Sequence, residues 1–321
     1  MTPHTFDIIG TGALAPERTV KNSELSEYVE TSDEWISSRT GISERRVLAG
    51  ETLTSIAAAA GKRALESAGL DAGRLDLIIC STLQGDYLTP SLSCLVQEAL
   101  GASCPAFDMN AACSGFLYAL DVAAGYFARG AAEHILVVAA EGMSRLIDWA
   151  DRETCVLFGD GAGAAVLKKG GSLRSSVIGA QGGRDSLYIP ASRGKSPFDG
   201  TGQEPMFLHM AGKDVFRFAV GAIVKNLEAA AEQAGVSLAD IDWIVPHQAN
   251  VRMLASASNQ LDIPIEKFLV NIQKYGNTSS ASIPLMLDEA VRDGRLKAGQ
   301  LVAMVAFGGG LTTGACILKW K

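Results

Sequence analysis

The stretch Asn110-Ala111-Ala112-Cys113-Ser114-Gly115-Phe116 joins the two patterns that decide the fold of this chain. Before it, residues 104–109 (CPAFDM) predict a short buried strand; after it, apolar residues recur at helical spacing until Gly130. We therefore expect Cys113 at a strand-to-helix junction, within the first turn of a helix. Free backbone N–H groups and the positive end of the helix dipole favour a thiolate there, and such positions can lower the pKa of a cysteine from ~8.5 to about 3.5–7.5. Cys113 is thus a candidate nucleophile, and a small buried hydrophobe is the alternative.

The composition is that of an ordinary globular protein. The chain has 321 residues, of which 48% are hydrophobic and 20% charged, enough for two domains or one large doubled domain. A net charge of −7 leaves no broad basic surface, so nucleic acid is not an expected partner.

The sequence indicates neither a membrane-spanning segment nor a metal or disulfide site. No apolar run reaches the ~18 residues that cross a bilayer, and the N-terminus lacks a basic segment followed by an apolar one, so we expect a cytoplasmic protein with no membrane contact. The six cysteines and four histidines show no metal-ligand spacing and no CxxC pair. We expect neither a metal site nor a disulfide framework.

Short apolar strands alternate with helical patterns along the whole chain. Strands are expected at residues 6–12, 76–81, 134–140 and 158–167, with an alanine-rich helix at about 54–68. This alternation predicts an α/β fold with a mostly parallel sheet and helices on its faces.

The second half of the chain repeats the first. Gly69 and Asp76 lie in motifs that recur around Gly235 and Asp242, 166 residues later. The repeat predicts two similar α/β halves, 1–170 and 171–321, related by a pseudo-twofold axis. The segment at about 183–212, rich in Gly, Pro and Ser, interrupts the second half and predicts a lid or pocket wall.

The same separation indicates where a site should form. It pairs Cys113 with Ser279, and it places His247 opposite Ser81, just beyond the end of a buried strand. Ligands of open α/β sheets bind at strand ends. We therefore expect Cys113, His247 and Asn277 to converge, although they are far apart in sequence.

Four motifs carry a resemblance to a known family. AACSGF at 111–116, PHQAN at 246–250, YGNTSSAS at 275–282 and AFGGG at 306–310 with Gly314 resemble, in order and spacing, the thiolase-fold condensing enzymes. Specifically, they resemble the β-ketoacyl-acyl carrier protein synthase III family, which initiates bacterial fatty acid synthesis. The resemblance implies a thiolase-like fold with α-β-α-β-α layers, a homodimer, and no cofactor beyond the coenzyme A thioester substrate.

The resemblance also implies a ping-pong condensation. Cys113 would take an acyl group from coenzyme A, while the backbone N–H groups of Cys113 and Gly310 hold the oxyanion. A malonyl thioester on acyl carrier protein would then lose CO₂ to give an enolate that accepts hydrogen bonds from His247 and Asn277. The carbanion would attack acyl-Cys113 to give a β-ketoacyl product.

Substrate contacts are carried over from the family in the same way. Those for coenzyme A are Trp35, Arg39, Arg152, Gly212 and Asn250; those for the acyl chain are Thr89, Met143, Phe158, Met206 and Leu208; those for acyl carrier protein are Lys213, Arg217 and Arg252. Acetyl-selective members carry phenylalanine, contributed across the dimer interface, at the position of Thr89. A smaller side chain there predicts tolerance of longer acyl donors. Asn259 and Gln260 stand where members can carry a lysine pair, which counts against strong carrier protein docking.

Alternatives stay open at this point. Ala306 disfavours a biosynthetic thiolase, and Asn277 disfavours an elongating synthase, which carries a second histidine there. A related acyltransferase or a condensing enzyme of secondary metabolism uses the same motifs. A papain-like hydrolase also uses Cys, His and Asn, but has no role for the repeat. Outside enzymes, a redox-sensing protein with a reactive Cys113 is the alternative.

Overall fold

The structure, a computed structural model, describes residues 5–191, 198 and 205–321. Its first sheet uses strands from the first half of the chain only. The strand order is β1-β7-β6-β4-β5. Their bounds are β1 Thr5–Leu14, β4 Leu77–Ser81, β5 Ala106–Met109, β6 His134–Gly142 and β7 Asp160–Gly170. Strands β4, β5 and β6 run parallel, whereas β7 runs antiparallel to both β6 and β1.

The second sheet repeats this arrangement with strands from the second half. Its order is β11-β12-β13-β8. The bounds are β8 Leu173–Ala180, β11 Trp243–Pro246, β12 Leu301–Gly308 and β13 Thr312–Lys319. Of its three strand pairings, only the one between β11 and β12 is parallel. A parallel bridge from Ile244 to Phe268 stands where β5 stands in the first sheet.

The expectation of mostly parallel sheets is only partly confirmed: β1, β4, β5 and β6 share one direction, as do β8, β11 and β12, but β7 and β13 run antiparallel to their neighbours. The cause is the connection before β7 and β13. Between β6 and β7 the chain forms only η4 (Met143–Arg145) and the four-residue helix α5 (Arg152–Cys155), and between β12 and β13 only η8 (Gly309–Leu311). Neither contains the long crossover helix that a parallel pair needs, so the strands return antiparallel.

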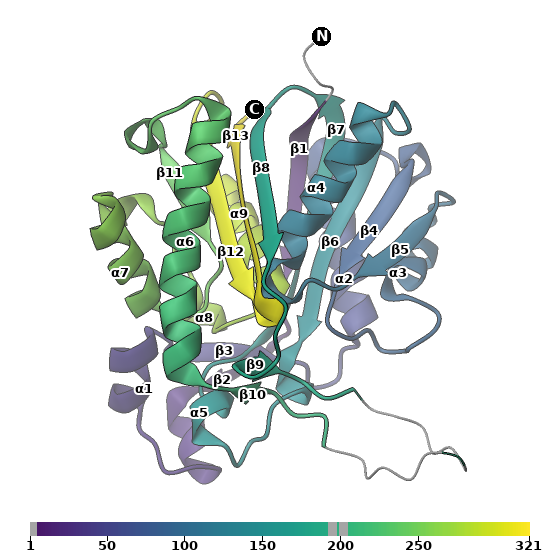
Figure 1. Cartoon of the computed structure of the whole chain (residues 1–321). Helices are drawn as coiled ribbons and strands as arrows, with labels where there is room; N and C mark the ends of the chain where they lie inside the picture. Colours follow the sequence, from purple (N-terminus) through teal and green to yellow (C-terminus); the bar gives the residue numbers. More distant parts are fainter. Residues whose placement is uncertain (1–4, 192–197, 199–204) are drawn as a thin grey trace.

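Helices separate and cover the two sheets (Figure 1). The central layer consists of α4 (Gly115–Ala128) and α9 (Ser282–Arg292). The outer helices are α2 (Leu53–Ala68) and α3 (Leu92–Leu100) on the first sheet, and α6 (Gly212–Ala234) and α7 (Val251–Leu261) on the second. The layers are thus α-β-α-β-α, which confirms the thiolase-like architecture expected from the sequence.

The central helices contact both sheets. Helix α4 packs on β4 and β6 of its own half and also on β8 and β13 of the other. Helix α9 packs on β1 and β7 as well as on β11. One buried cluster therefore joins the halves, with Phe116 and Leu120 on α4 next to Met286 on α9 and Leu318 on β13.

Small residues let an outer helix approach its sheet closely. A Cβ on Gly10 of β1 would lie 2.4 Å from the carbonyl oxygen of Ala64, and one on Gly12 would lie 2.3 Å from that of Ala60. Both alanines belong to α2, which begins after Thr52, whose hydroxyl accepts a hydrogen bond from the N–H of Ser55, and ends at Gly69 with φ +60°. The alanine-rich sequence of α2 thus serves close helix–strand packing.

The remaining elements gather at one end of the layers, in the lower part of Figure 1. They are η1 (Asn22–Glu27), α1 (Asp33–Thr40), α8 (Ile272–Tyr275), the pair β2 (Arg18–Lys21) and β3 (Glu44–Val47), and the pair β9 (Leu187–Tyr188) and β10 (His209–Met210); the short turns elsewhere are η2 (Ala72–Arg74), η5 (Leu238–Asp240) and η6 (Ile265–Lys267). On β3, the fully buried Arg45 donates to the carbonyls of Val20 and Val156 and to Asn22 Oδ1.

Strands β9 and β10 bracket the predicted lid or pocket wall. Residues 192–197 and 199–204 of that segment lie outside the described residues. The described flanks are tied to the body by hydrogen bonds from Leu208 N to Leu146 O (2.8 Å) and from Gly183 N to Gly310 O (3.0 Å).

The repeat is confirmed, with one correction. Strands β4 and β11 begin 166 residues apart, but α4 and α9 begin 167 apart, at Gly115 and Ser282. The turns before them, η3 (Ala112–Ser114) and η7 (Ser279–Ala281), keep this larger separation. Ser280, not Ser279, is therefore the counterpart of Cys113. The extra residue falls between strand and helix, where sequence similarity could not locate it.

Candidate active site

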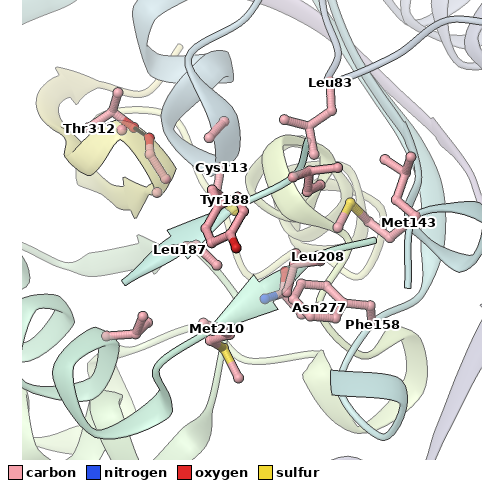
Figure 2. A pocket seen from close by; sticks show the side chains of 18 of the residues that line it. Leu83, Cys113, Met143, Phe158, Leu187, Tyr188, Leu208, Met210, Asn277 and Thr312 are labelled. Atoms are coloured by element: carbon pink, nitrogen blue, oxygen red, sulfur yellow. Dashed lines mark hydrogen bonds between the residues drawn. The ribbon is translucent and has the colours of Figure 1, made fainter. Parts of the chain in front are cut away.

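A cavity of about 810 Å³ opens at the shared end of the two sheets (Figure 2). Cys113, His247, Asn277 and Gly310 all line it. They come from four different junctions between elements, and the repeat predicted that three of them, Cys113, His247 and Asn277, would converge. Most of the other lining side chains are apolar, so water competes little with a ligand that the walls enclose.

Cys113 lies in η3, directly before α4, at the junction expected from the sequence. Burial raises its pKa to about 12, although a hydrogen bond with the side chain of Ser279 acts in the opposite direction. The expectation of a lowered pKa was therefore wrong, because loss of solvation and the nearby Glu141 carboxylate raise the pKa by more than the hydrogen bonds lower it. Cys113 is a thiol at neutral pH and must lose its proton as it reacts.

His247 follows β11 and is almost fully buried. Its Nδ1 lies 2.7 Å from the hydroxyl of Ser282, which also accepts from the backbone N–H of Gln248. The contact with Ser282 occupies Nδ1, and a hydrogen bond with the backbone of Ser279 acts to raise the pKa of the ring. Burial lowers the pKa of His247 to about 3, so the ring is neutral at physiological pH.

Asn277 is fixed by the backbone on both sides. Its N–H donates to Leu157 O (2.8 Å), and its carbonyl accepts from Gly159 N (3.0 Å). Its side-chain Oδ1 accepts from the N–H of Ser279 at 2.8 Å. Since the oxygen is occupied, the amide nitrogen is the group left to donate a hydrogen bond into the cavity.

The glycines at the end of β12 let its backbone pack directly against the backbone of Cys113. A Cβ on Gly308 would lie 2.6 Å from the backbone nitrogen of Cys113 and 3.1 Å from Ala112 Cβ. Gly310 has φ +122°, a conformation that is essentially limited to glycine. The missing Cβ at 308 thus makes room for the nucleophile's own backbone.

Sequence reasoning missed Glu141, a buried carboxyl at the end of β6. Its oxygens accept hydrogen bonds from Leu83 N (3.0 Å), Ser279 Oγ (3.2 Å) and Ser280 Oγ (2.6 Å). Burial raises its pKa to about 7. An acidic residue that closes an otherwise apolar run, HILVVAAE, was the available signal.

The acyl-pocket residues proposed from the sequence divide into two groups. Met143, Phe158, Met206 and Leu208 line the cavity, whereas Thr89 is exposed and does not line the cavity of its own chain. Apolar lining residues that sequence reasoning missed are Leu83, Leu88, Leu146, Leu187, Ile189 and Met210.

Gly212 and Asn250 lie at the cavity, at the starts of α6 and α7. The proposed carrier protein contacts occupy the first two turns of α6 (Lys213, Arg217) and the first turn of α7 (Arg252), and all three are exposed. Basic side chains therefore stand close to where two helices begin at the cavity.

Trp35, Arg39 and Arg152 meet, but they do not line the cavity. The guanidinium carbons lie 4.6 Å (Arg39) and 5.0 Å (Arg152) from the Trp35 ring centroid. A purine between Trp35 and Arg152 needs two contacts of about 3.5 Å each, so Arg152 must move before a base can stack there.

A cysteine, a neutral imidazole and an amide donor that share one cavity between two repeated α/β halves define a thiolase-fold condensing enzyme. Residues 107–186 match the family described as 3-Oxoacyl-[acyl-carrier-protein (ACP)] synthase III, and residues 231–320 match its C-terminal part. The chain is 45% identical to the Beta-ketoacyl-[acyl-carrier-protein] synthase III of Clostridium acetobutylicum, over 99% of both chains.

Two solved structures share the whole fold. The crystal structure of 3-oxoacyl-[acyl-carrier-protein] synthase III from Aquifex aeolicus VF5 matches with a TM-score of 0.92 and 43% identity, covering 98% of this chain and 100% of that one. The priming beta-ketosynthase from the R1128 polyketide biosynthetic pathway matches with a TM-score of 0.92 and 38% identity, over 99% and 97%. The chain belongs to the β-ketoacyl-[acyl-carrier-protein] synthase III family. It is an acyltransferase of the condensing type, the type of enzyme that initiates fatty acid synthesis.

Proposed function

We propose that this enzyme condenses an acyl-coenzyme A primer with malonyl-acyl carrier protein by way of an acyl-Cys113 intermediate. The observation that carries the proposal is the shared cavity, in which Cys113 meets two neutral donors, His247 and Asn277. No cofactor is needed, because the coenzyme A thioester is itself the activated substrate.

In the first half-reaction the sulfur of Cys113 attacks the thioester carbonyl and coenzyme A leaves as a thiolate. The backbone N–H groups of Cys113 and Gly310 hold the developing oxyanion. The close contact between Gly308 and the backbone of Cys113 supports this role, because it fixes the N–H of Cys113 relative to the N–H of Gly310.

In the second half-reaction the malonyl group loses CO₂ and leaves an enolate. Its oxygen accepts hydrogen bonds from Nε2 of His247 and Nδ2 of Asn277, each worth ~10²–10³ in rate. Both side chains are held from behind, by Ser282 and by the N–H of Ser279. The carbanion attacks acyl-Cys113, which restores the cysteine and releases the β-ketoacyl product.

The test is mass spectrometry of the protein after mixing with acetyl-coenzyme A. An acetyl adduct on Cys113 is expected, Cys113→Ala should make no β-ketoacyl product, and His247→Ala should lose malonyl decarboxylation. No adduct would favour the redox-sensing alternative. Condensation by Cys113→Ala would refute the mechanism.

We propose that the enzyme tolerates acyl primers longer than acetyl. A largely apolar cavity of about 810 Å³ and the small side chain of Thr89 support this. Comparable kcat/KM values with acetyl- and hexanoyl-coenzyme A are expected, and strict use of acetyl-coenzyme A would contradict the proposal. The similarity to a priming ketosynthase of a polyketide pathway makes priming of a secondary metabolite the second candidate function. Comparing condensation rates with the acyl carrier proteins of fatty acid and of polyketide synthesis would distinguish the two functions.

We propose that coenzyme A binds near Trp35, Arg39 and Arg152, with its pantetheine passing Gly212 and Asn250. The family that this chain resembles binds an acidic acyl carrier protein, which would dock on Lys213, Arg217 and Arg252. Condensation by Arg252→Glu should fall at low salt and approach wild type at high salt. Unchanged activity at low salt would exclude Arg252 from docking.

We further propose a cytoplasmic homodimer in which Thr89 of each subunit faces the acyl pocket of the other, and in which residues 1–170 and 171–321 are the two halves of each subunit. Light scattering after size exclusion gives the mass, which should be twice that of the chain. Among the described residues, no helix combines the length and apolar character that spanning a bilayer requires.

A further inference from the structure

A second titratable side chain lies beside Cys113 and has no role in the chemistry above. Glu141 is buried at the end of β6 and does not line the cavity. Among the described residues no basic side chain forms an ion pair with it. It accepts hydrogen bonds from the N–H of Leu83 and from the hydroxyls of Ser279 and Ser280, and the backbone of Ser280 also helps to stabilise its charge.

One of those hydroxyls bridges to the sulfur. Ser279 Oγ lies 3.2 Å from Glu141 Oε1, and its interaction with the Cys113 side chain acts to lower the pKa of that thiol. The position of Ser279 is strongly fixed: its φ is +52° and its N–H is held by Asn277 Oδ1. A continuous path therefore runs from the thiol through one hydroxyl to a buried carboxylate.

We propose that Glu141 accepts the proton of Cys113 through the Ser279 hydroxyl when the cysteine is acylated, and returns it when the product leaves. This inference rests on the proposed function. In the first step the S–H bond breaks, Ser279 takes that proton and passes its own to Oε1, and the sulfur electron pair forms the bond to the thioester carbon. Coenzyme A departs as a thiolate and takes a proton from water. In the second step condensation releases a Cys113 thiolate, and the proton stored on Glu141 returns by the same path.

Charge explains why this path is preferred to release of the proton into solvent. Loss of the Cys113 proton to solvent would leave two neighbouring anions in a buried site. Transfer to Glu141 moves the existing charge over a short distance and adds none. His247 is a poor alternative acceptor, because burial holds its pKa near 3 and Nδ1 already meets Ser282. Glu141, whose pKa burial raises to about 7, is matched to neutral pH.

The titratable groups around Glu141 are few. Cys113 faces it from η3, and the neighbouring strands β4 and β7 carry Cys80 and Asp160. Asp160 is occupied by hydrogen bonds from Ser144 and Leu48, and Cys80 is a fully buried thiol with a raised pKa. The charged residues of α2 are exposed, and η7 contributes only serines and an alanine. On α4, which also packs on β6, Tyr118 donates to Gly179 O and Asp121 accepts from Ser176 Oγ, both on β8. Ionisation of Glu141 therefore governs the local charge near neutrality.

The experiment measures the rate of acetyl-Cys113 formation by rapid quench and mass spectrometry, from pH 5.5 to 9. The wild-type rate should rise with pH and level off above about 7, since only ionised Glu141 accepts a proton. Glu141→Gln should acylate ~10²-fold more slowly and lose the inflection. Ser279→Ala should slow acylation similarly, because the bridge is absent, and it serves as the second variant if Glu141→Gln does not fold.

Ser280→Ala is the matched control. It removes the shorter hydrogen bond to Glu141 but leaves the Ser279 hydroxyl between Cys113 and Glu141, so the acylation rate at high pH should persist. The inflection should move to higher pH, because the Glu141 carboxylate loses a donor that stabilises its charge. A wild-type pH profile in Glu141→Gln, or equal losses in Ser279→Ala and Ser280→Ala, would overturn the proposal in favour of a structural role.

Malonyl decarboxylation separates this inference from the proposed function. Measured in a Cys113→Ala background, CO₂ release should stay within about twofold when Glu141→Gln is added. If decarboxylation holds and acylation of Glu141→Gln is unimpaired, only the proton path fails. If the wild type neither acylates nor decarboxylates, the proposed function itself fails.

Discussion

Alanine in place of Gly308 should disable acylation without abolishing the fold. Its Cβ would lie 2.6 Å from the backbone nitrogen of Cys113, so one of the two segments must give way by about 0.8 Å to reach ordinary contact. Ala112 Cβ and Thr312 Oγ1, each 3.1 Å from the new atom, limit movement in other directions. Overpacking of this kind costs about 1–3 kcal/mol of stability. A displacement approaching 1 Å at the nucleophile costs ~10² in rate.

The assay is the burst of acetyl-Cys113 formed from acetyl-coenzyme A, read beside the thermal unfolding midpoint. Gly309→Ala is the matched control, because its Cβ would meet nothing closer than Leu187 O at 3.5 Å. We expect Gly309→Ala to acylate within a few-fold of wild type and Gly308→Ala to be ~10²-fold slower. Equal rates for the two variants would refute the contact that we infer between Gly308 and the nucleophile.

Three further outcomes are expected. Asn277→Asp keeps the acceptor for Ser279 N but loses the Nδ2 donor, so decarboxylation, followed as CO₂ release, should fall ~10²–10³-fold while Cys113 acylation continues; equal loss of both steps would contradict this. The pKa of Glu141 rises on folding from 4.5 to about 7, so the folded protein holds a proton that the unfolded chain has released, and wild type should lose about 3 kcal/mol relative to Glu141→Gln as pH rises through that window. Urea unfolding at pH 5 and pH 8 measures this, and a pH-independent difference would count against it. Arg45→Met leaves two buried carbonyls and Asn22 Oδ1 unpaired and should cost ~3 kcal/mol or more in the same assay, whereas Arg46→Met, on the half-buried neighbour, should cost less than about 1 kcal/mol.

Local pattern and repetition were enough to predict two similar α/β halves and to bring Cys113, His247 and Asn277 together, whereas the order of the five layers came from the family resemblance. Apolar runs mark buried strands, and a repeat of such runs requires the two halves to pack alike. The strand directions were harder, because they depend on whether a connection contains a long helix. The connection between β6 and β7 contains only η4 and α5, which sequence spacing does not reveal.

The electrostatics of the site could not be predicted from sequence. A helix end at Cys113 was visible in the pattern, but the pKa depends on how completely the surrounding chain excludes water, and burial raises it to about 12. Glu141 was missed for the same reason. Its partners Ser279 and Ser280 are about 140 residues away, and only the packed fold brings them to β6.

The shared central layer makes each half depend on the other for its stability. Helix α4 is covered partly by strands of the second half, and α9 partly by strands of the first. An isolated half would leave one flank of its own helix exposed to water, so neither half is expected to fold alone. Joined in one chain, the two halves cover each other, and the same strained turn presents sulfur in one half and hydroxyl groups in the other.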